Sequence, residues 1–521
     1  MKKDKFYITT PIYYVNDKPH VGHAYTTIIA DTLARYHRFN GRDVYFVTGT
    51  DENSQKNVEA AEKRGEKDIK KYLDEMSAVW AGAWDSLGIT NDDFIRTTEK
   101  RHLVGVEKFF KTVWDKGDIY LGAYEGYYCA GCEAFVPESD LAQGKCPIHQ
   151  KEPKKIKEKN YFFRLTKYRD ALLDYIGKNE DFVEPVSRRN EILNYIRDFM
   201  EDISISRESQ KWGIPLPSLA LSRSSEAFRE GEAKAGRAEI KNQVLYVWFD
   251  ALLNYLTAIG YGTDEKKFKK YWPADLHLVG KDIIKFHCAL WPAMLMSAGL
   301  PLPKKIFAHG FFTIDGLKIS KSLGNILDPI EFAQKYGGDV LRYFLLREIT
   351  LGEDGDFSVL RLKERYQSEL ANGLGNLMNR VLAMTEKYFN GKVPEKCEGN
   401  ISPTWLSYDI NMSEVKPHAA LKDVWDLVDY LNKFIDSEQP WVLAKIDQGR
   451  LARVIYTLLE SLRHIGLLLL PFMPETAEKI LDSLGVSAAA KKLSAEKLKL
   501  WGLLKEGGII KKAGQLFPRL D

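Results

Sequence analysis

The segment from Ile8 to Asp51 constrains this chain most, because it has the pattern of a strand, a turn, a helix and a second strand. The first strand runs into turn formers that end at Pro19, and residues Ala24 to His37 then place apolar side chains at helical spacing. This order is typical of a parallel α/β sheet, in which ligands bind beyond the carboxyl ends of the strands. The segment therefore predicts a nucleotide site at that edge.

Two histidines lie where the predicted helix begins. His20 and His23 flank Gly22 at the helix N-terminus, where unpaired backbone N–H groups and the helix dipole attract phosphate. Gly22 has no side chain, so a base or ribose can lie against the backbone. A His-x-Gly-His tetrapeptide also arises by chance, and two surface histidines near a helix cap are the alternative interpretation.

A second stretch, Leu317 to Asn325, lies about three hundred residues later and is rich in lysine and serine. It follows an apolar run, Lys305 to Ile314, that predicts a strand, and then an Asp-Gly turn. A loop of this composition can close over a polyphosphate and neutralise charge that develops as a bond breaks. An ordinary basic loop is the alternative, but the presence of both stretches in one chain favours a nucleotide site.

Together the two stretches resemble the HIGH and KMSKS signatures of class I aminoacyl-tRNA synthetases, with Val21 and Ile319 as conservative departures. Within that class the chain is similar to the methionyl-tRNA synthetases over nearly its whole length. The resemblance implies a ligase that activates methionine with ATP, accompanied by Mg2+, and then transfers it to the terminal ribose of tRNA. The implied catalytic residues are His20, His23, Lys318 and Lys321, and Gly22, Ser320 and Ser322 are implied to bind ATP.

An aromatic run from Tyr246 to Ala251 is predicted to end a strand, and Tyr255 follows one helical turn later. Aromatic rings suit a thioether, whose polarizable sulfur packs well against them, although such runs also belong to ordinary cores. Leu252 and Asn53 depart from the proline and histidine that relatives carry. The resemblance implies a methionine pocket of Ile12, Tyr14, Asp51, Trp248, Ala251, Tyr255, Ile283 and His287, with Asp51 receiving the ammonium group.

A further ATP contact is predicted after the strand Leu276 to Val279. There Gly280 allows close approach, and the Asp282 carboxylate can accept hydrogen bonds from ribose hydroxyls. The family resemblance agrees with this role for Asp282. A simple helix cap is the alternative, because Asp is favoured at helix N-termini.

Three of the five cysteines have a metal-like spacing. Cys129-x-x-Cys132 is followed, after thirteen residues, by Cys146-x-x-His149. Two close pairs on short turns suit tetrahedral zinc, and four protein ligands leave no open position, so one structural Zn2+ per chain is expected. Free thiols and a zinc-finger binding module are the alternatives.

Composition sets broad limits on the protein class. The chain has 521 residues, 45% of them hydrophobic and 28% charged, and a net charge of +3, so nucleic-acid contacts must come from local patches. The longest apolar run, Ile465 to Leu470, is too short for a membrane span, and the N-terminus does not resemble a secretory signal. We therefore expect a cytoplasmic protein, and the resemblance implies a monomer without a C-terminal tRNA-binding extension.

The predicted fold class is α/β: a Rossmann-like parallel-sheet catalytic domain split by a zinc-containing connective insertion, followed by an α-helical anticodon-binding bundle. The sheet is expected to restart at Gln243 to Asp250, and helical spacing dominates from Val359 to Leu484. The expected parts are the first catalytic half (1–117), the insertion (118–242), the second catalytic half with the KISKS loop (243–326), linking stem-contact helices (327–358) and the anticodon-binding domain (359–521).

The resemblance also implies three anticodon contacts, Asn376, Arg380 and Trp441. Readers of single-stranded RNA stack bases on aromatic rings and bind base edges. From the residues alone, a core position for Trp441 and a solvated charge for Arg380 are the alternatives. For the whole chain, the alternatives are a catalytically inactive tRNA-binding paralogue and a class I synthetase for another small apolar amino acid.

Overall fold

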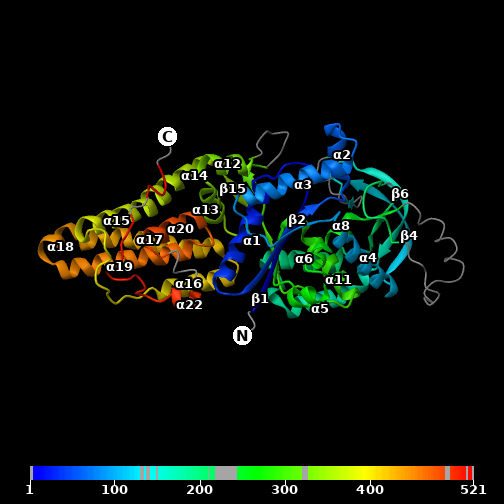
Figure 1. Cartoon of the computed structure of the whole chain (residues 1–521). Coiled ribbons are helices and arrows are strands. Elements are labelled where there is room, and N and C mark those ends of the chain that lie inside the picture. Colours follow the sequence, from blue (N-terminus) through cyan, green and yellow to red (C-terminus); the bar gives the residue numbers. More distant parts are fainter. Residues whose placement is uncertain are drawn as a thin grey trace.

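The computed structural model describes residues 4–129, 134–136, 141–147, 151–208, 210–217, 243–318, 327–486, 493–511 and 514–518. The fold has an α/β part built on a parallel sheet, an antiparallel sheet at one side of it, and a long helical part at the other (Figure 1). The helix α1 (Val21–Phe39) lies between the parallel sheet and the helical part (Figure 1). The predicted combination of a Rossmann-like sheet and a C-terminal helical bundle is therefore confirmed.

The central sheet has six strands in the order β3-β2-β1-β11-β12-β7, and every neighbouring pair is parallel. Strand order reverses between β1 and β11, which is where open α/β sheets bind ligands. The edge strand β7 comes from the segment predicted as the connective insertion, and it pairs with β12. The strands are β1 (Lys5–Tyr14), β2 (Asp43–Asp51), β3 (Asp93–Arg96), β7 (Val183–Glu184), β11 (Leu276–Gly280) and β12 (Ile306–His309).

The predicted strand from Gln243 to Asp250 is wrong. Only β10 (Val244–Leu245) is a strand there, and it pairs antiparallel with β9 (Ser206–Arg207) outside the central sheet. The chain then turns into the short helices α8 (Val247–Ala251) and α9 (Asn254–Thr257). A short apolar run suits a buried strand and a buried helix equally well, so its periodicity did not separate them.

An antiparallel sheet follows the first catalytic half, with strand order β5-β4-β6-β8. Its long pair, β4 (Ile119–Cys129) and β6 (Lys154–Phe163), is in continuous register from Ile119 opposite Phe163 to Tyr128 opposite Lys154. The remaining strands are β5 (Ala134–Val136) and β8 (Ile203–Ser204). Helices of the α/β part are α2 (Gln55–Arg64), α3 (Ile69–Ser86), α4 (Lys100–Asp115), α5 (Arg169–Lys178), α6 (Val186–Asp198), α10 (Glu265–Tyr271) and α11 (Trp291–Ser297).

Beyond β12 a small three-stranded sheet carries the hairpin of β13 (Phe312–Ile314) and β14 (Leu317–Lys318), and β13 also pairs with β15 (Gly355–Phe357). The predicted Asp-Gly turn joins β13 to β14. Asp315 and Gly316 both have positive φ, 48° and 76°, as a two-residue hairpin turn requires.

The C-terminal part is helical. α17 (Pro417–Glu438) and α19 (Gln448–Leu469) lie in the region predicted to be helical, Val359 to Leu484, and pack against one another. α19 begins at an Asp447 cap, whose carboxylate accepts from Arg450 N at 2.9 Å, and it ends just before Pro471. The helices of the C-terminal part are α12 (Pro329–Tyr336), α13 (Gly338–Glu348), α14 (Val359–Arg365), a π-helical stretch (Tyr366–Gly375), α15 (Asn376–Phe389), α16 (Ser402–Ser413), α17 (Pro417–Glu438), α18 (Pro440–Ile446), α19 (Gln448–Leu469), α20 (Pro474–Ser483) and α22 (Ala495–Leu498).

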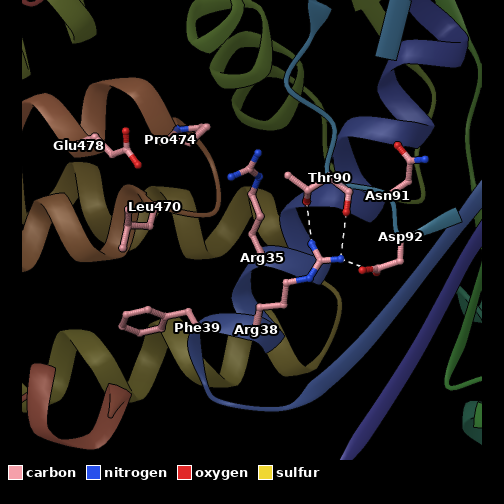
Figure 2. Close-up of a pocket in the computed structure, with 9 residues that line it drawn as sticks. All are labelled: Arg35, Arg38, Phe39, Thr90, Asn91, Asp92, Leu470, Pro474 and Glu478. Carbon is pink, nitrogen blue, oxygen red and sulfur yellow. Dashed lines mark hydrogen bonds and ion pairs between the residues drawn. The ribbon is translucent and has the colours of Figure 1, made fainter. Parts of the chain in front are cut away.

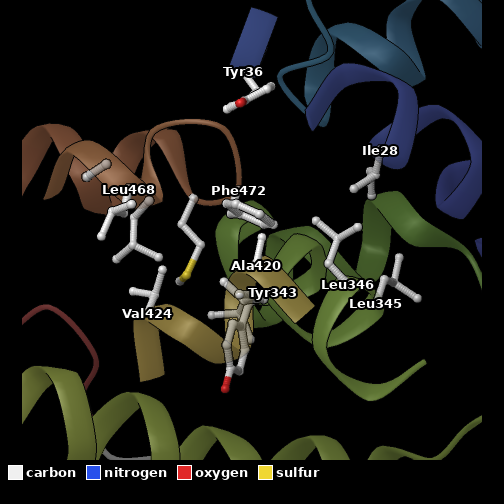
Figure 3. Close-up of a cluster of buried hydrophobic side chains, with 14 of the residues drawn as sticks. Ile28, Tyr36, Tyr343, Leu345, Leu346, Ala420, Val424, Leu468 and Phe472 are labelled. Atoms are coloured by element: carbon white, nitrogen blue, oxygen red, sulfur yellow. The ribbon is translucent and has the colours of Figure 1, made fainter. Parts of the chain in front are cut away.

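One hydrophobic core runs without a break from α1 into this helical part (Figure 3). Ile28 of α1 lies close to Leu346 of α13, and Val424 of α17 and Phe472 pack further along the same cluster. The catalytic sheet and the bundle are thus joined by continuous burial, which positions them as one unit.

Candidate active site

The two predicted histidines meet at the N-terminus of α1 and cap it. His20 is the N-cap residue, and its Nδ1 accepts from Gly22 N at 3.1 Å. His20 N in turn donates to His23 Nδ1 at 3.2 Å, and the two imidazole rings stack with centroids 3.7 Å apart. Because both Nδ1 atoms accept, each neutral ring carries its proton on Nε2, the tautomer that donates to an anionic oxygen.

The charge state of His23 follows from its surroundings. Trp80 and Tyr13 lie against its ring, at centroid distances of 4.9 Å and 5.1 Å. Burial, and then the nearby His20, lower the pKa of His23 well below its ordinary value. His23 is therefore a neutral hydrogen-bond donor at physiological pH.

Gly22 has a packing role that the sequence did not indicate. A Cβ at this position would lie 3.0 Å from Cε1 and 3.1 Å from Nδ1 of His20. A side chain at position 22 would therefore move the His20 imidazole, in addition to covering the backbone.

The chain on either side of the lysine-rich stretch lies against α1. Lys318 lies in β14, while Ser320, Lys321 and Ser322 are outside the described residues. β13, the partner of β14, packs on α1 through Phe312, whose ring lies 4.6 Å from that of Tyr25. Where the description resumes, Leu327 O accepts from Val21 N at 3.1 Å, one residue after His20. The chain on each side of this stretch thus contacts the helix that carries the histidine motif.

Gly280 and Asp282 lie at the carboxyl end of β11, as predicted. A Cβ on Gly280 would approach Asp282 Oδ1 to 2.5 Å, so glycine leaves room for that carboxylate. Asp282 is exposed, and the short helical turn that contains it has no side-chain cap hydrogen bond. Asp282 lies in the first turn of this helix without capping it, which leaves its carboxylate available for the predicted ATP contact.

His309, at the carboxyl end of β12, was not predicted from the sequence. His309 ends β12, and its Nε2 lies 2.7 Å from Thr26 Oγ1 on α1. Burial lowers the pKa of His309. The histidine ties the end of β12 to α1. The available signal was a histidine in the middle of the apolar run from Lys305 to Ile314.

The predicted methionine pocket is assembled around a hydrogen-bonded pair. Tyr255 Oη lies 2.8 Å from His287 Nε2, and His287 Nδ1 lies 3.0 Å from Ile283 O. Because Nδ1–H donates to a carbonyl, Nε2 accepts from the tyrosine. Burial lowers the pKa of His287 to about 4, so it is neutral at physiological pH. Trp248 stands edge-on to His287, with centroids 6.0 Å apart.

The other pocket residues come from the first catalytic half and α8. Ile12 packs against the core that contains Tyr255, while Ala251 is buried on α8. Tyr14 and Asp51 are paired across β1 and β2, so both side chains belong to the carboxyl ends of these strands. Asp51 is buried, and its Oδ1 accepts from Asn53 N at 3.2 Å.

The predicted metal ligands are described only in part. Cys129 ends β4 and is buried, and Cys146 is buried in a tight loop where its N donates to Lys151 O at 2.9 Å. Cys132 and His149 are outside the described residues. In the part of the chain that is described, no three His, Cys, Asp or Glu side chains gather as a metal site would require. The two thiols have the sheltered positions that structural zinc ligands need.

The predicted anticodon residues lie on the bundle. Asn376 and Arg380 are on one face of α15, where Asn376 is exposed and Arg380 pairs with Asp436 of α17 at 2.6 Å. Trp441 lies on α18 with 46% of its surface exposed. The alternative of a core tryptophan is therefore wrong, and Arg380 is held by an ion pair. α18 is at the end of the molecule farthest from the sheet (Figure 1).

A cavity of about 520 Å3 opens between α1, the turn before β3 and α20 (Figure 2). Arg38 points across it, with its guanidinium on Thr90 and Asp92. The lining also includes Arg35 and Glu478, so its charges are balanced. The predicted nucleotide and methionine residues do not line this cavity.

Comparison with known proteins gives a consistent result. A family model for class I tRNA synthetases, marked M, matches residues 6–155 and 138–382, and a model of the anticodon binding domain of methionyl tRNA ligase matches residues 395–521. A methionine–tRNA ligase of Thermotoga maritima is 45% identical over 99% of this chain and 80% of its own. One from Caldanaerobacter subterraneus is 46% identical over 100% of this chain and 79% of its own.

The fold agrees as closely. A solved structure of Mycobacterium tuberculosis methionyl-tRNA synthetase in complex with methionyl-adenylate superposes with a TM-score of 0.90 at 38% identity, covering 99% of this chain and 100% of that one. Among the described residues, no helix has the length and apolar character that crossing a bilayer requires.

Proposed function

Since this chain belongs to the methionyl-tRNA synthetase family of class I tRNA synthetases, we propose how its own residues carry out that family's reaction. The chain is a methionine–tRNA ligase. It joins methionine to ATP as methionyl-adenylate, releases pyrophosphate, and transfers methionine to its tRNA. The residue roles below are our proposal.

In the first step, the methionine ammonium group binds the Asp51 carboxylate, and the thioether lies among Trp248, Tyr255 and His287. Neutral His287 accepts from Tyr255, so neither polar group is left unpaired beside an apolar ligand. The methionine carboxylate then attacks the α-phosphate of ATP. The wall of Ile12, Tyr14, Ala251 and Ile283 completes the pocket.

Positioning and electrostatics supply the catalysis, because no protein nucleophile is needed. His20 and His23 donate Nε2–H to the triphosphate at the positive end of α1. Lys318 and Lys321 neutralise the departing pyrophosphate. Mg2+ accompanies ATP on general grounds. Gly22, Gly280, Asp282, Ser320 and Ser322 complete the ATP site.

The observation that carries this assignment is the hydrogen bond from Val21 N to Leu327 O. It joins the first turn of α1 to Leu327, two residues after the lysine-rich stretch ends at Asn325. This contact supports the proposal that two motifs separated by about three hundred residues act on one polyphosphate at this helix end.

For the second step, the terminal ribose hydroxyl of tRNA attacks the mixed anhydride. We propose that Asn376, Arg380 and Trp441 contact the anticodon, at the opposite end of the molecule from the adenylate. Exposed Trp441 offers a ring on which a splayed base can stack.

We propose one structural Zn2+, held by Cys129, Cys132, Cys146 and His149. A closed set of four ligands stabilises the loops at the end of β4 and supplies no catalytic chemistry. Metal analysis of the purified protein should find about one zinc per chain. A protein free of zinc and equally stable would contradict this assignment.

The remaining proposals concern the whole chain. We divide it into catalytic halves at 1–117 and 243–326, a connective insertion at 118–242, linking helices at 327–358 and an anticodon-binding domain at 359–521. We further propose that the protein is cytoplasmic, since its substrate is tRNA, and that it is a monomer. Sedimentation at working concentration tests the oligomeric state.

The decisive experiment is amino-acid-dependent exchange of pyrophosphate into ATP, with methionine compared with isoleucine, leucine, valine and cysteine. We expect exchange with methionine alone. Exchange with another amino acid would keep the chemistry and discard the pocket. No exchange at all would favour an inactive tRNA-binding paralogue.

A further inference from the structure

A buried chain of hydrogen bonds lies behind the proposed methionine pocket. His102 of α4 places Nε2 at 2.7 Å from Asp250 Oδ1, and Asn53 Nδ2 donates to Asp250 Oδ2 at 2.7 Å. The other imidazole nitrogen, Nδ1, lies 2.8 Å from Thr257 Oγ1. We call Asn53, Asp250, His102 and Thr257 the relay. It links four segments: the turn after β2, α8, α4 and α9.

The relay is sealed from solvent. His102, Asp250 and Thr257 have no exposed surface, and Asn53 has 4%. A buried carboxylate is costly unless both oxygens are hydrogen-bonded, and here each oxygen has one donor from a different segment. The position of Asn53 relative to α8 is therefore fixed by the Asp250 carboxylate.

Each end of this connection touches a residue of the pocket. Asn53 N donates to Asp51 Oδ1 at 3.2 Å, so the main chain of residue 53 sets the direction of the carboxylate proposed to receive the ammonium group. Asp250 lies on α8 between Trp248 and Ala251. The relay thus joins the polar side of the pocket to its aromatic side.

We propose that Asp250 and His102 are positioning residues for methionine: they hold Asp51 at a fixed place relative to the α8 wall, and so determine recognition of the ammonium group. This inference rests on the proposed role of Asp51. Neither residue touches the substrate. Their effect passes through Asn53, whose side-chain amide donates to Asp250 and whose main-chain N–H donates to Asp51.

Asp250→Asn is the first variant. A carboxamide has one acceptor oxygen where the carboxylate has two, so it cannot accept from both His102 and Asn53. The bond to Asn53 is then weaker, and the main-chain N–H that donates to Asp51 is held less firmly. We expect the KM for methionine in pyrophosphate exchange to rise about tenfold, with the KM for ATP within about twofold of wild type.

The sharper readout separates the ammonium group from the rest of the ligand. Methioninol carries the ammonium and the thioether, whereas 4-(methylthio)butan-1-ol carries the thioether alone. Tryptophan fluorescence, with Trp248 in the pocket, reports the binding of both. We expect Asp250→Asn to weaken methioninol about tenfold and the deaminated alcohol less than twofold. Equal weakening of both ligands would overturn the proposal, since it would indicate general damage to the pocket.

Three further variants protect the test against misfolding. His102→Gln keeps an N–H donor for Asp250, and we expect it to bind methioninol nearly as wild type does, whereas His102→Leu should resemble Asp250→Asn. Equal effects of glutamine and leucine would overturn the relay. Thr257→Val removes only the hydroxyl beside His102 Nδ1 and should weaken methioninol about threefold without affecting the alcohol. Unchanged methioninol binding in this variant would also count against the proposal.

Glu460→Gln is the matched control. Glu460 is a fully buried carboxylate in α19 that pairs with Arg463 at 2.6 Å, away from the pocket. It should lower Tm and leave both ligands unaffected. Wild-type exchange is measured in the same series: its absence would remove the proposed function, whereas normal exchange with insensitive relay variants would remove this inference alone.

Discussion

At the scale of single residues, the histidine motif works through hydrogen bonds made before any ligand arrives. The Nδ1 atoms of His20 and His23 accept hydrogen bonds from backbone N–H groups at the start of α1. Their tautomers and ring directions are thereby fixed, so the Nε2–H groups need little reorganisation to meet a phosphate. Such preorganisation requires that nothing crowd the rings.

Gly22→Ala tests that requirement. The new methyl group would lie 3.0 Å from Cε1 of His20 and must displace the imidazole. We expect pyrophosphate exchange to slow about tenfold, because a small misplacement of a positioning group is costly. Gly82→Ala on α3 is the control, since its Cβ would meet no atom within 4 Å and should not slow exchange. An exchange rate as fast as wild type in Gly22→Ala would contradict the assigned role of His20.

At the scale of elements, α1 connects the site to the helical part. Asp31 in its middle forms a buried ion pair with Arg342 of α13 at 2.8 Å. Arg342 also donates to Phe472 O at 2.8 Å and to Pro471 O at 2.9 Å, in the turn before α20. The nearby arginine Arg35 holds Asp31 too, and together the cations keep its pKa below the ordinary value against the effect of burial.

Arg342→Ala should therefore lower the free energy of unfolding by about 3 kcal/mol, because it removes one of the two arginines that pair with the buried Asp31 carboxylate and leaves two carbonyl groups without their donor. Urea unfolding measures this. Lys422→Ala, which breaks the exposed Lys422–Asp426 pair on α17, should change stability by less than about 0.5 kcal/mol. A loss of similar size in the two variants would show that the buried pair does not stabilise the junction.

The elements also show how far sequence could predict this protein. Strands β1 and β2 and the bundle helices were predictable, because their apolar patterns are long and regular, and β11 and β12 were predictable as apolar runs. Residues Val247 to Ala251 were mistaken for part of a strand because the apolar run is too short to carry a period. The edge strand β7 has only two residues and is defined by its partner β12, so no local signal announces it.

The residues of the proposed site likewise include some that the sequence could predict and some that it could not. The positions of His20, His23 and Asp282 were predictable because each lies in the turn or first helical turn that follows a predicted strand. His102 and Asp250 were missed as a pair because they are separated by 148 residues and meet only when α4 packs against α8 and α9. The tautomers of His23 and His287 depend on hydrogen bonds that folding creates, and no sequence pattern reports them.

At the scale of the whole molecule, α18 lies at one end, far from the parallel sheet and from the N-terminus of α1, where we propose the adenylate site (Figure 1). A hydrophobic core runs from α1 through α13 and α17 and joins the sheet to the bundle. The proposed amino-acid site and the proposed anticodon contacts are therefore far apart. The two activities, adenylate formation and tRNA binding, should respond separately to substitution.

Trp441→Ala tests this separation. The ring is 46% exposed on α18, and stacking of a base on an aromatic ring contributes about 1–3 kcal/mol. Its loss should raise the KM for tRNA in aminoacylation about tenfold, while methionine-dependent pyrophosphate exchange, which needs no tRNA, stays at the wild-type rate. Tyr430→Ala removes another exposed aromatic ring, 60% exposed on α17, where it borders a cavity shared with α16, and should alter neither reaction. If Trp441→Ala slowed exchange as much as aminoacylation, the bundle would be acting on the catalytic site; if it left aminoacylation intact, α18 would not bind the anticodon. Only a loss confined to aminoacylation is consistent with separate sites for adenylate formation and anticodon binding.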